Sequence, residues 1–323
     1  MLALVHEFEP LPSPVLHSLS AKDGWLLRVW DFSPEPARRP RAIVVIGYAM
    51  MVDSRTICRP DRPTIASVLV AAGFRVLVPD LRGHGESGPL AAQGGQWSDD
   101  DIVGDVGSYV ALARALEPEL PIALIGHSLF GHTALAWLGQ HADAAGREVA
   151  ALAAVACDIW NRRFEPSWPI WAIKRLLHAA AFLLVKVIGY MPTRRLRLGT
   201  NDESLGYFGQ FHAWITRNRW CDGSGAIDYH AGLSAIRVPF LHLLSEGDRL
   251  YARPSSALRM SAPISTREAL VLGRDDAPGE LAKLRPDHMQ VLTDPRNKLA
   301  WHWLAGWLGR ALAPDSHEDW NER

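Results

Sequence analysis

Ser128 lies in a short run in which its hydroxyl could become a nucleophile. The run reads ALIGHSLFGH, from Ala123 to His132, between an apolar stretch and a helix-like stretch. A serine hydroxyl needs a base to take its proton, and a sharp strand-to-helix turn would expose it. That turn favours small residues two before and two after the serine, where Gly126 fits and Phe130 does not. The run alone therefore leaves two interpretations, a nucleophile or a serine that caps the helix.

The elements around this run alternate between strands and helices. Apolar, β-branched runs predict buried strands, and acidic first turns, glycines and helical spacing mark the helices between them. We expect strands over 24–32, 41–46, 74–78, 121–125, 149–156, 240–244 and 269–272, and helices over 63–72, 99–116, 129–140 and 298–312. Strands that alternate with helices predict an α/β fold with a mostly parallel central sheet and helices on both faces.

A second motif, DLRGHGES over Asp80–Ser87, follows one of the buried strands. Together with the Ser128 turn and the alternating elements, it resembles the α/β-hydrolase superfamily from about Gly24 to Leu312. That resemblance implies the order nucleophile, acid, base. It assigns Ser128 as nucleophile, Asp248 in SEGDRL as the carboxylate, and His288 in RPDHMQVL as the general base.

Two other carboxylates compete with Asp248 for the role of acid. Asp158 follows the strand next to the nucleophile strand, where some members of the superfamily place the acid, and Asp287 adjoins His288. The oxyanion of such an enzyme is held by backbone amides. The resemblance points to Leu129 and to Ala49 or Met50 in the loop GYAMMVDS, where many relatives have His-Gly instead.

Residues 158–232 interrupt the alternation with a mostly helical, Trp-rich insertion that shows no clear strand. We expect residues 1–157 and 233–313 to form the core, this insertion to form a cap above Ser128, and 314–323 to be a flexible tail. The segment Ile188–Trp220 resembles the cap of a group of bacterial predicted α/β hydrolases without an assigned substrate. Candidate pocket residues are aromatic: Tyr48, Trp160, Phe164, Trp168, Trp171, Tyr207, Phe208, Phe211 and Trp214.

Composition limits the remaining classes of function. The formal net charge is −1, which gives no basic footprint for nucleic acid. The three cysteines have no metal spacing and suggest free thiols in the cytoplasm, and no stretch reads as a signal peptide or an integral membrane segment. We expect no metal and no cofactor. The short basic run Arg194, Arg195 and Arg197 fits a solvated loop, a substrate anion or an anionic membrane surface.

The sequence thus predicts a serine hydrolase that cleaves a carboxylic ester or thioester with an apolar portion. The partner would be a small-molecule ester or acyl substrate, and both a monomer and a dimer remain open. An acyltransferase with the same Ser-His-Asp triad is one alternative. A non-catalytic ligand-binding protein on the same fold is the other, and Phe130 is the residue that supports it.

Overall fold

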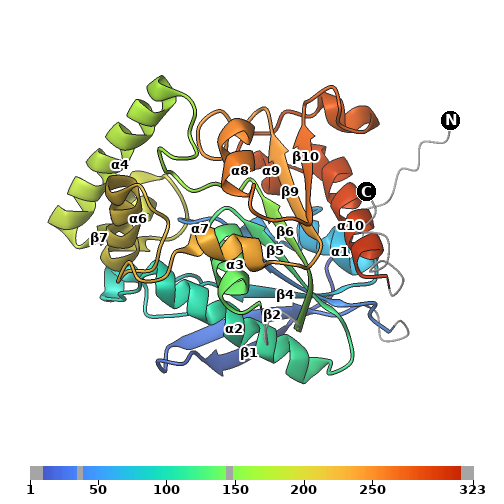
Figure 1. The fold of residues 1–323 in the computed structure, drawn as a ribbon. Coiled ribbons are helices and arrows are strands. Elements are labelled where there is room, and N and C mark those ends of the chain that lie inside the picture. The colour runs from blue at the N-terminus through green and yellow to red at the C-terminus, as the bar shows by residue number, and fades with distance from the viewer. Residues whose placement is uncertain (1–9, 35–38, 143–147, 314–323) are drawn as a thin grey trace.

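The computed structural model describes residues 10–34, 39–142 and 148–313. Its centre is an eight-stranded sheet in the order β1-β2-β4-β3-β5-β6-β9-β10 (Figure 1). The strands are β1 (Val15–Ser20), β2 (Leu26–Phe32), β3 (Ile43–Gly47), β4 (Arg75–Asp80), β5 (Ile122–His127), β6 (Val149–Val155), β9 (Phe240–Ser245) and β10 (Arg267–Leu272). The six strands from β4 to β10 in that order pair in parallel, and β1 and β2 are antiparallel. The predicted fold class is confirmed.

Helices cover both faces of this sheet. On one face α1 (Ile65–Ala71) packs against α10 (Lys298–Ala311), and on the other α2 (Asp99–Leu116) packs against α3 (Leu129–Gln140) (Figure 1). The predicted bounds of α2 and α3 are confirmed. Ser98 caps α2, since its hydroxyl accepts from the amide of Asp101, and three aspartates in the first turn suit the helix dipole. The central strands β3 and β5 are therefore buried on both faces of the sheet, which matches their continuous apolar sequences.

The chain between β6 and β9 contains the predicted insertion. Its elements are α4 (Trp168–Ile188), β7 (Tyr190–Met191), α5 (Thr193–Leu196), β8 (Glu203–Ser204), α6 (Leu205–Arg217) and α7 (Tyr229–Gly232). The mostly helical character of the insertion is confirmed. The sequence did not suggest the short antiparallel pair that β7 and β8 form, with two residues in each strand. The exact division into core and cap stays a prediction, and the expected tail, 314–323, lies outside the described residues.

The remaining short elements complete the C-terminal part and the connections. They are α8 (Pro254–Met260) and α9 (Gln290–Thr293), with 3-10 turns at Ser54–Thr56, Ala91–Gln93, Leu233–Ala235, Gly279–Lys283 and Pro295–Asn297. Across the described ranges, no helix combines the length and the apolar character that crossing a bilayer requires.

Candidate active site

Ser128 occupies a sharp turn between β5 and α3. Its backbone has φ 51° and ψ −105°, and its side chain makes no capping hydrogen bond to α3. A non-glycine residue in this region of backbone space costs on the order of 1–3 kcal/mol, and such strain clusters at functional sites. The helix-cap interpretation of Ser128 therefore does not describe this turn.

Phe130 fits the turn because two glycines make room elsewhere. Gly131, one place later than the usual position, lies against Gly126: a Cβ on Gly126 would meet the Gly131 Cα at 2.3 Å. The fully buried Phe130 ring lies instead over the end of β3, where a Cβ on Gly47 would meet its Cγ at 2.2 Å. Gly47 is thus the small residue that compensates for Phe130.

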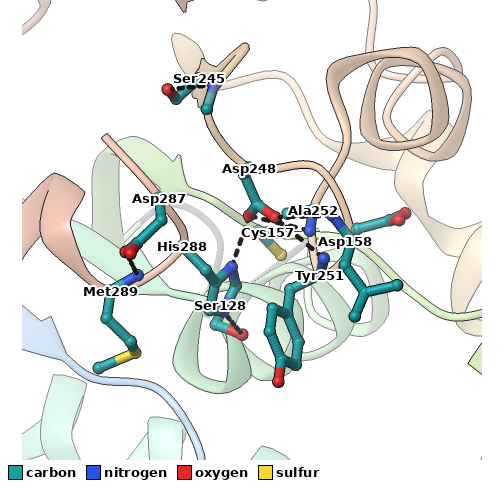
Figure 2. Close-up of polar contacts among 12 residues, drawn as sticks. Ser128, Cys157, Asp158, Ser245, Asp248, Tyr251, Ala252, Asp287, His288 and Met289 are labelled. Atoms are coloured by element: carbon teal, nitrogen blue, oxygen red, sulfur yellow. Dashed lines mark hydrogen bonds and ion pairs between the residues drawn. The ribbon is translucent and has the colours of Figure 1, made fainter. Parts of the chain in front are cut away.

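His288 lies between the hydroxyl of Ser128 and a carboxylate (Figure 2). Its Nε2 is 3.0 Å from Ser128 Oγ, and its Nδ1 is 2.7 Å from Asp248 Oδ2. Because an ionised carboxylate can only accept, the imidazole proton belongs on Nδ1 and donates to Asp248. Nε2 is then free to accept the proton of the serine hydroxyl.

Asp248 follows β9 and is held in place by backbone amides. Its carboxylate accepts from the amides of Tyr251 at 2.9 Å and Ala252 at 3.0 Å. Burial alone would raise the pKa of Asp248, but the hydrogen bond and the charge of His288, with these amides, hold it below its usual value. The group therefore stays ionised beside the imidazole.

The two rival acids are engaged elsewhere. Asp158 is buried and pairs with Lys174, whose Nζ lies 3.4 Å from Oδ2. Burial raises the pKa of Asp158 to about 6, against the opposing effect of Lys174. Asp287 accepts from the amides of Met289 and Gln290 at 3.0 and 2.8 Å, and so shapes the loop that carries His288.

His127 contacts the loop that carries His288. It is fully buried, and burial together with the neighbouring His288 lowers its pKa to about 3, so the ring is neutral near pH 7. Its Nε2–H donates to the backbone carbonyl of His288 at 2.9 Å. This contact fixes the backbone of His288 without adding a charge beside it.

Three backbone amides near Ser128 have no acceptor among the residues that the structure describes. Ala49 and Met50 follow β3 and line the same cavity as Ser128 and Leu129. Within the described ranges, no hydrogen bond occupies the N–H of Ala49, Met50 or Leu129. Unpaired amides that face a cavity are suited to hold an anionic oxygen.

The insertion holds the loop that carries two of these amides. The N–H of Met51 donates to Glu203 Oε1 at 2.6 Å, and its carbonyl accepts from the amides of Thr200 and Asn201 at 2.8 and 3.0 Å. Glu203 is fully buried, and His84 Nε2 lies 3.1 Å from the same Oε1. The loop is therefore fixed from outside by residues about 150 positions away in sequence.

Ser128 and His288 open into a cavity of about 430 Å³ that is lined mainly by apolar side chains. Other polar lining groups already have partners: Asp158 pairs with Lys174 at 3.4 Å, His132 Nε2 lies 3.0 Å from Asp99 Oδ1, and His178 Nε2 lies 3.3 Å from His212 Nδ1. Burial, with the nearby His212, lowers the pKa of His178 to about 4, so this ring is neutral near pH 7. The cavity thus presents little charge beyond the Ser128 end.

The cavity includes some of the aromatic residues expected to line it and not others. Trp160, Tyr207, Phe208, Phe211 and Trp214 line it.

Tyr48, Phe164, Trp168 and Trp171 do not line the cavity, so these predictions were wrong. The Tyr48 hydroxyl is buried against the amide of Leu81, at 2.7 Å. Phe164 packs against His230, Trp171 is buried in the stripe of α4 that faces the protein, and Trp168 lies on the surface under the guanidinium of Arg162.

Several lining residues escaped sequence reasoning. Tyr251 and Met289 lie one to three positions after Asp248 and His288, so proximity to those residues could have suggested them. The others carry no local signal and meet only in the fold: Met51, Val52, Ile159, Leu177, His178, Ala181, Met191 and Leu198. Among the described residues, no group of three or more His, Cys, Asp or Glu side chains could hold a metal ion.

About half of the chain is similar to a known protein family. Residues 58–208 match the family described as serine aminopeptidase, S33. No curated protein matches the sequence.

Solved structures share the fold at low sequence identity. An esterase from Pyrococcus furiosus is 14% identical, with a TM-score of 0.58 over 93% of this chain and 91% of the other. A thioesterase domain from the curacin biosynthetic pathway is 15% identical, with a TM-score of 0.54 over 92% and 99%. The esterase domain of a Rhodothermus marinus protein is also 15% identical, with a TM-score of 0.53 over 92% and 98%.

Proposed function

Because the chain belongs to the α/β-hydrolase superfamily, we propose that it is a serine hydrolase acting on a carboxylic ester or thioester with an apolar acyl portion. The observation that carries the proposal is a chain of two hydrogen-bond contacts. Ser128 Oγ lies 3.0 Å from His288 Nε2, and His288 Nδ1 lies 2.7 Å from Asp248 Oδ2. Ser128, at one end of this chain of contacts, lies in a strained turn and faces an apolar cavity.

In the first half-reaction, Ser128 Oγ attacks the carbonyl carbon of the substrate while His288 Nε2 takes the hydroxyl proton. The carbonyl oxygen becomes an oxyanion that the amides of Leu129 and of Ala49 or Met50 hold. When the bond to the leaving group breaks, His288 delivers its proton to the departing oxygen or sulfur. Asp248 stabilises the imidazolium throughout.

In the second half-reaction, water replaces the leaving group. His288 takes a proton from that water, and the resulting hydroxide attacks the acyl-enzyme carbonyl. The bond to Ser128 Oγ breaks, the proton returns to the serine, and the carboxylic acid leaves. In an acyltransferase, an alcohol or amine would take the place of the water at this step.

The cavity supports the choice of an apolar acyl group. At about 430 Å³ it lies within the range of small-molecule sites. Aromatic residues of the insertion, including Trp160, Phe211 and Trp214, form much of its wall. We propose that residues 158–232 act as the cap that shapes this cavity above Ser128.

A labelling experiment tests the chemistry. A fluorophosphonate probe should label the wild type at Ser128, and His288→Ala should reduce the labelling rate by several orders of magnitude while leaving the far-UV circular dichroism unchanged. Labelling that is absent, or that His288→Ala leaves as fast, contradicts the proposal and favours a binding protein.

A substrate panel tests the acyl preference. Among p-nitrophenyl acetate, butyrate, octanoate and dodecanoate, kcat/KM should rise with chain length by up to about fourfold per methylene that the cavity buries. Ser128→Ala should abolish turnover. A flat profile contradicts the apolar acyl site, and an excess of transfer product over free acid when an alcohol is added would make the protein a transferase.

A further inference from the structure

The cap helix α4 exposes much of its apolar surface. Its buried residues are Trp171, Lys174, His178 and Val185, and three more, Ala181, Phe182 and Leu184, are partly buried against the core. In the described part of the chain, 14 large hydrophobic side chains are exposed, and nine of them gather here. These nine form what we call the apolar face: Trp168, Ile173, Leu176, Leu177, Leu183, Val187, Ile188, Leu196 and Leu198. Several are more than 60% exposed, including Leu176 at 73% and Val187 at 77%.

This face lies on the outside of the molecule. Figure 1 shows α4 at the edge of the structure, with α6 on its inner side and no other helix over its outer side. Large apolar side chains that are exposed together on one side of a fold mark an interaction site. A stable fold does not need it, because α4 packs against the protein through its other side.

The segment that carries the apolar face, residues 166–201, has charged side chains of one sign only. Between residues 166 and 201 the sequence contains no Asp or Glu. Five basic residues are exposed there: Arg175, Lys186, Arg194, Arg195 and Arg197. The sixth, Lys174, is buried and its charge is taken up inside the protein by Asp158 and Glu165. The local excess of positive charge stands out in a chain whose formal net charge is −1.

We propose that the apolar face docks on an anionic lipid surface, with α4 lying in the plane of the interface. An apolar helix face flanked by Lys and Arg is the pattern of interfacial helices, and anionic headgroups attract basic side chains near them. In this arrangement α4 lies on the bilayer and does not span it, since no helix in the described ranges is long and apolar enough to cross a membrane.

Charge also decides against a second copy of the chain as the occupant. A symmetric dimer would place the same patch on both sides of its interface. The five exposed basic residues of one copy would then face the five of the other, and like charges brought together in this way oppose association. An anionic bilayer offers the complementary sign to all five at once.

Docking in this orientation would bring the cavity to the lipid. Leu177 and Leu198 belong to the apolar face and also line the cavity that holds Ser128. An acyl ester could therefore pass from the bilayer into the cavity without crossing water. This consequence rests on the proposed hydrolase function, whereas the docking itself does not.

Vesicle co-sedimentation tests the docking with the full chain. The wild type should bind vesicles of phosphatidylcholine and phosphatidylglycerol at 3:1, bind pure phosphatidylcholine much more weakly, and lose affinity as salt rises. Arg195→Gln should weaken binding about fivefold, and Leu183→Glu at least as much. The matched controls Arg259→Gln on α8 and Leu299→Glu on α10 lie away from the face and should leave binding unchanged.

Two readouts separate docking from folding and from catalysis. Leu183→Glu should keep the wild-type far-UV circular dichroism and the turnover of p-nitrophenyl acetate, which is water-soluble. Ser128→Ala should bind vesicles like the wild type while it loses turnover. A wild type that binds the vesicles but hydrolyses no ester would refute only the hydrolase proposal.

Three results would overturn the docking. The first is no binding to the anionic vesicles. The second is binding that Leu183→Glu and Arg195→Gln weaken no more than their controls do. The third is a wild-type dimer in sedimentation velocity that Leu183→Glu dissociates, because a second copy would then cover the face.

Discussion

Replacing Gly47 with Ala tests how the turn at Ser128 accommodates Phe130. A Cβ at position 47 would lie 2.2 Å from the Phe130 Cγ and within 2.6 Å of both Cδ atoms. An ordinary contact between carbon atoms is about 3.5–4.0 Å, so the ring would have to move by more than 1 Å (roughly the difference between these distances) inside a fully buried site. Overpacking of this kind costs about 1–3 kcal/mol, and we expect the upper end for Gly47→Ala because the Phe130 ring is fully buried.

The double variant makes the argument specific. Phe130→Ala alone should cost about 3–5 kcal/mol through the cavity it leaves. With the ring removed, the new methyl at position 47 meets no clash and fills part of that cavity. Gly47→Ala/Phe130→Ala should therefore be no less stable than Phe130→Ala, which corresponds to a coupling of about 2–3 kcal/mol between the two sites.

Urea unfolding followed by far-UV circular dichroism measures these free energies, and fluorophosphonate labelling reports on Ser128. Gly47→Ala should also slow labelling, because the displaced ring belongs to the first turn of α3, two residues after the nucleophile. The control is Gly104→Ala, on α2, where an added Cβ meets nothing within 4 Å. Additive free energies in the double variant, or a Gly47→Ala protein as stable as the control, would refute the account of Phe130.

Three further changes probe the site and the core. Asp248→Asn should lower kcat by about 10³–10⁴-fold, because the amide has no charge to stabilise the imidazolium and replaces one of the two acceptor oxygens with a donor; an unchanged kcat would exclude Asp248 as the acid. Glu203→Ala should lower kcat about 10- to 100-fold with little change in KM, since the Met51 amide loses its acceptor, and Glu203→Gln, which keeps an acceptor oxygen, should retain most of the activity. Burial lowers the pKa of His242 to about 4, so unfolding takes up a proton between pH about 4 and 6.5, and stability is lost as pH falls through that window. His242→Gln should flatten the dependence of unfolding free energy on pH there by about 1.4 kcal/mol per unit, and an unchanged slope would contradict a neutral, buried ring.

Local signals predicted the sheet and its helices well because each element carries its own pattern. β3 and β5 are continuous apolar runs that only a strand buried on both faces accommodates. The acidic first turn and serine cap of α2 mark its beginning to the residue. The convergence of Ser128, Asp248 and His288 was a prediction from the order of motifs, and their catalytic roles stay proposals.

The parts that sequence did not provide depend on contacts between distant residues. Nothing near Phe130 indicates that Gly47, more than 80 positions away, makes room for its ring. The sequence also did not indicate which side of α4 faces the protein, because apolar residues lie on most sides of this helix. Helical spacing therefore could not tell that Trp171 faces the protein while Trp168 faces outward, and both were expected in the cavity.

The contacts of the insertion also bear on how a substrate reaches Ser128. Both polar backbone groups of Met51 are bonded to residues 200–203, and Gly199 packs so closely that a Cβ there would meet the Met51 carbonyl oxygen at 2.1 Å. Lifting the whole insertion would break these bonds and release the loop that carries the Ala49 and Met50 amides. Access that keeps the oxyanion site intact must therefore use an opening that does not move residues 199–203. Leu177 and Leu198 line the cavity and are also exposed on the apolar face, so entry beside them would leave residues 199–203 in place. We therefore expect the substrate to enter along α4, from whatever surface the apolar face binds.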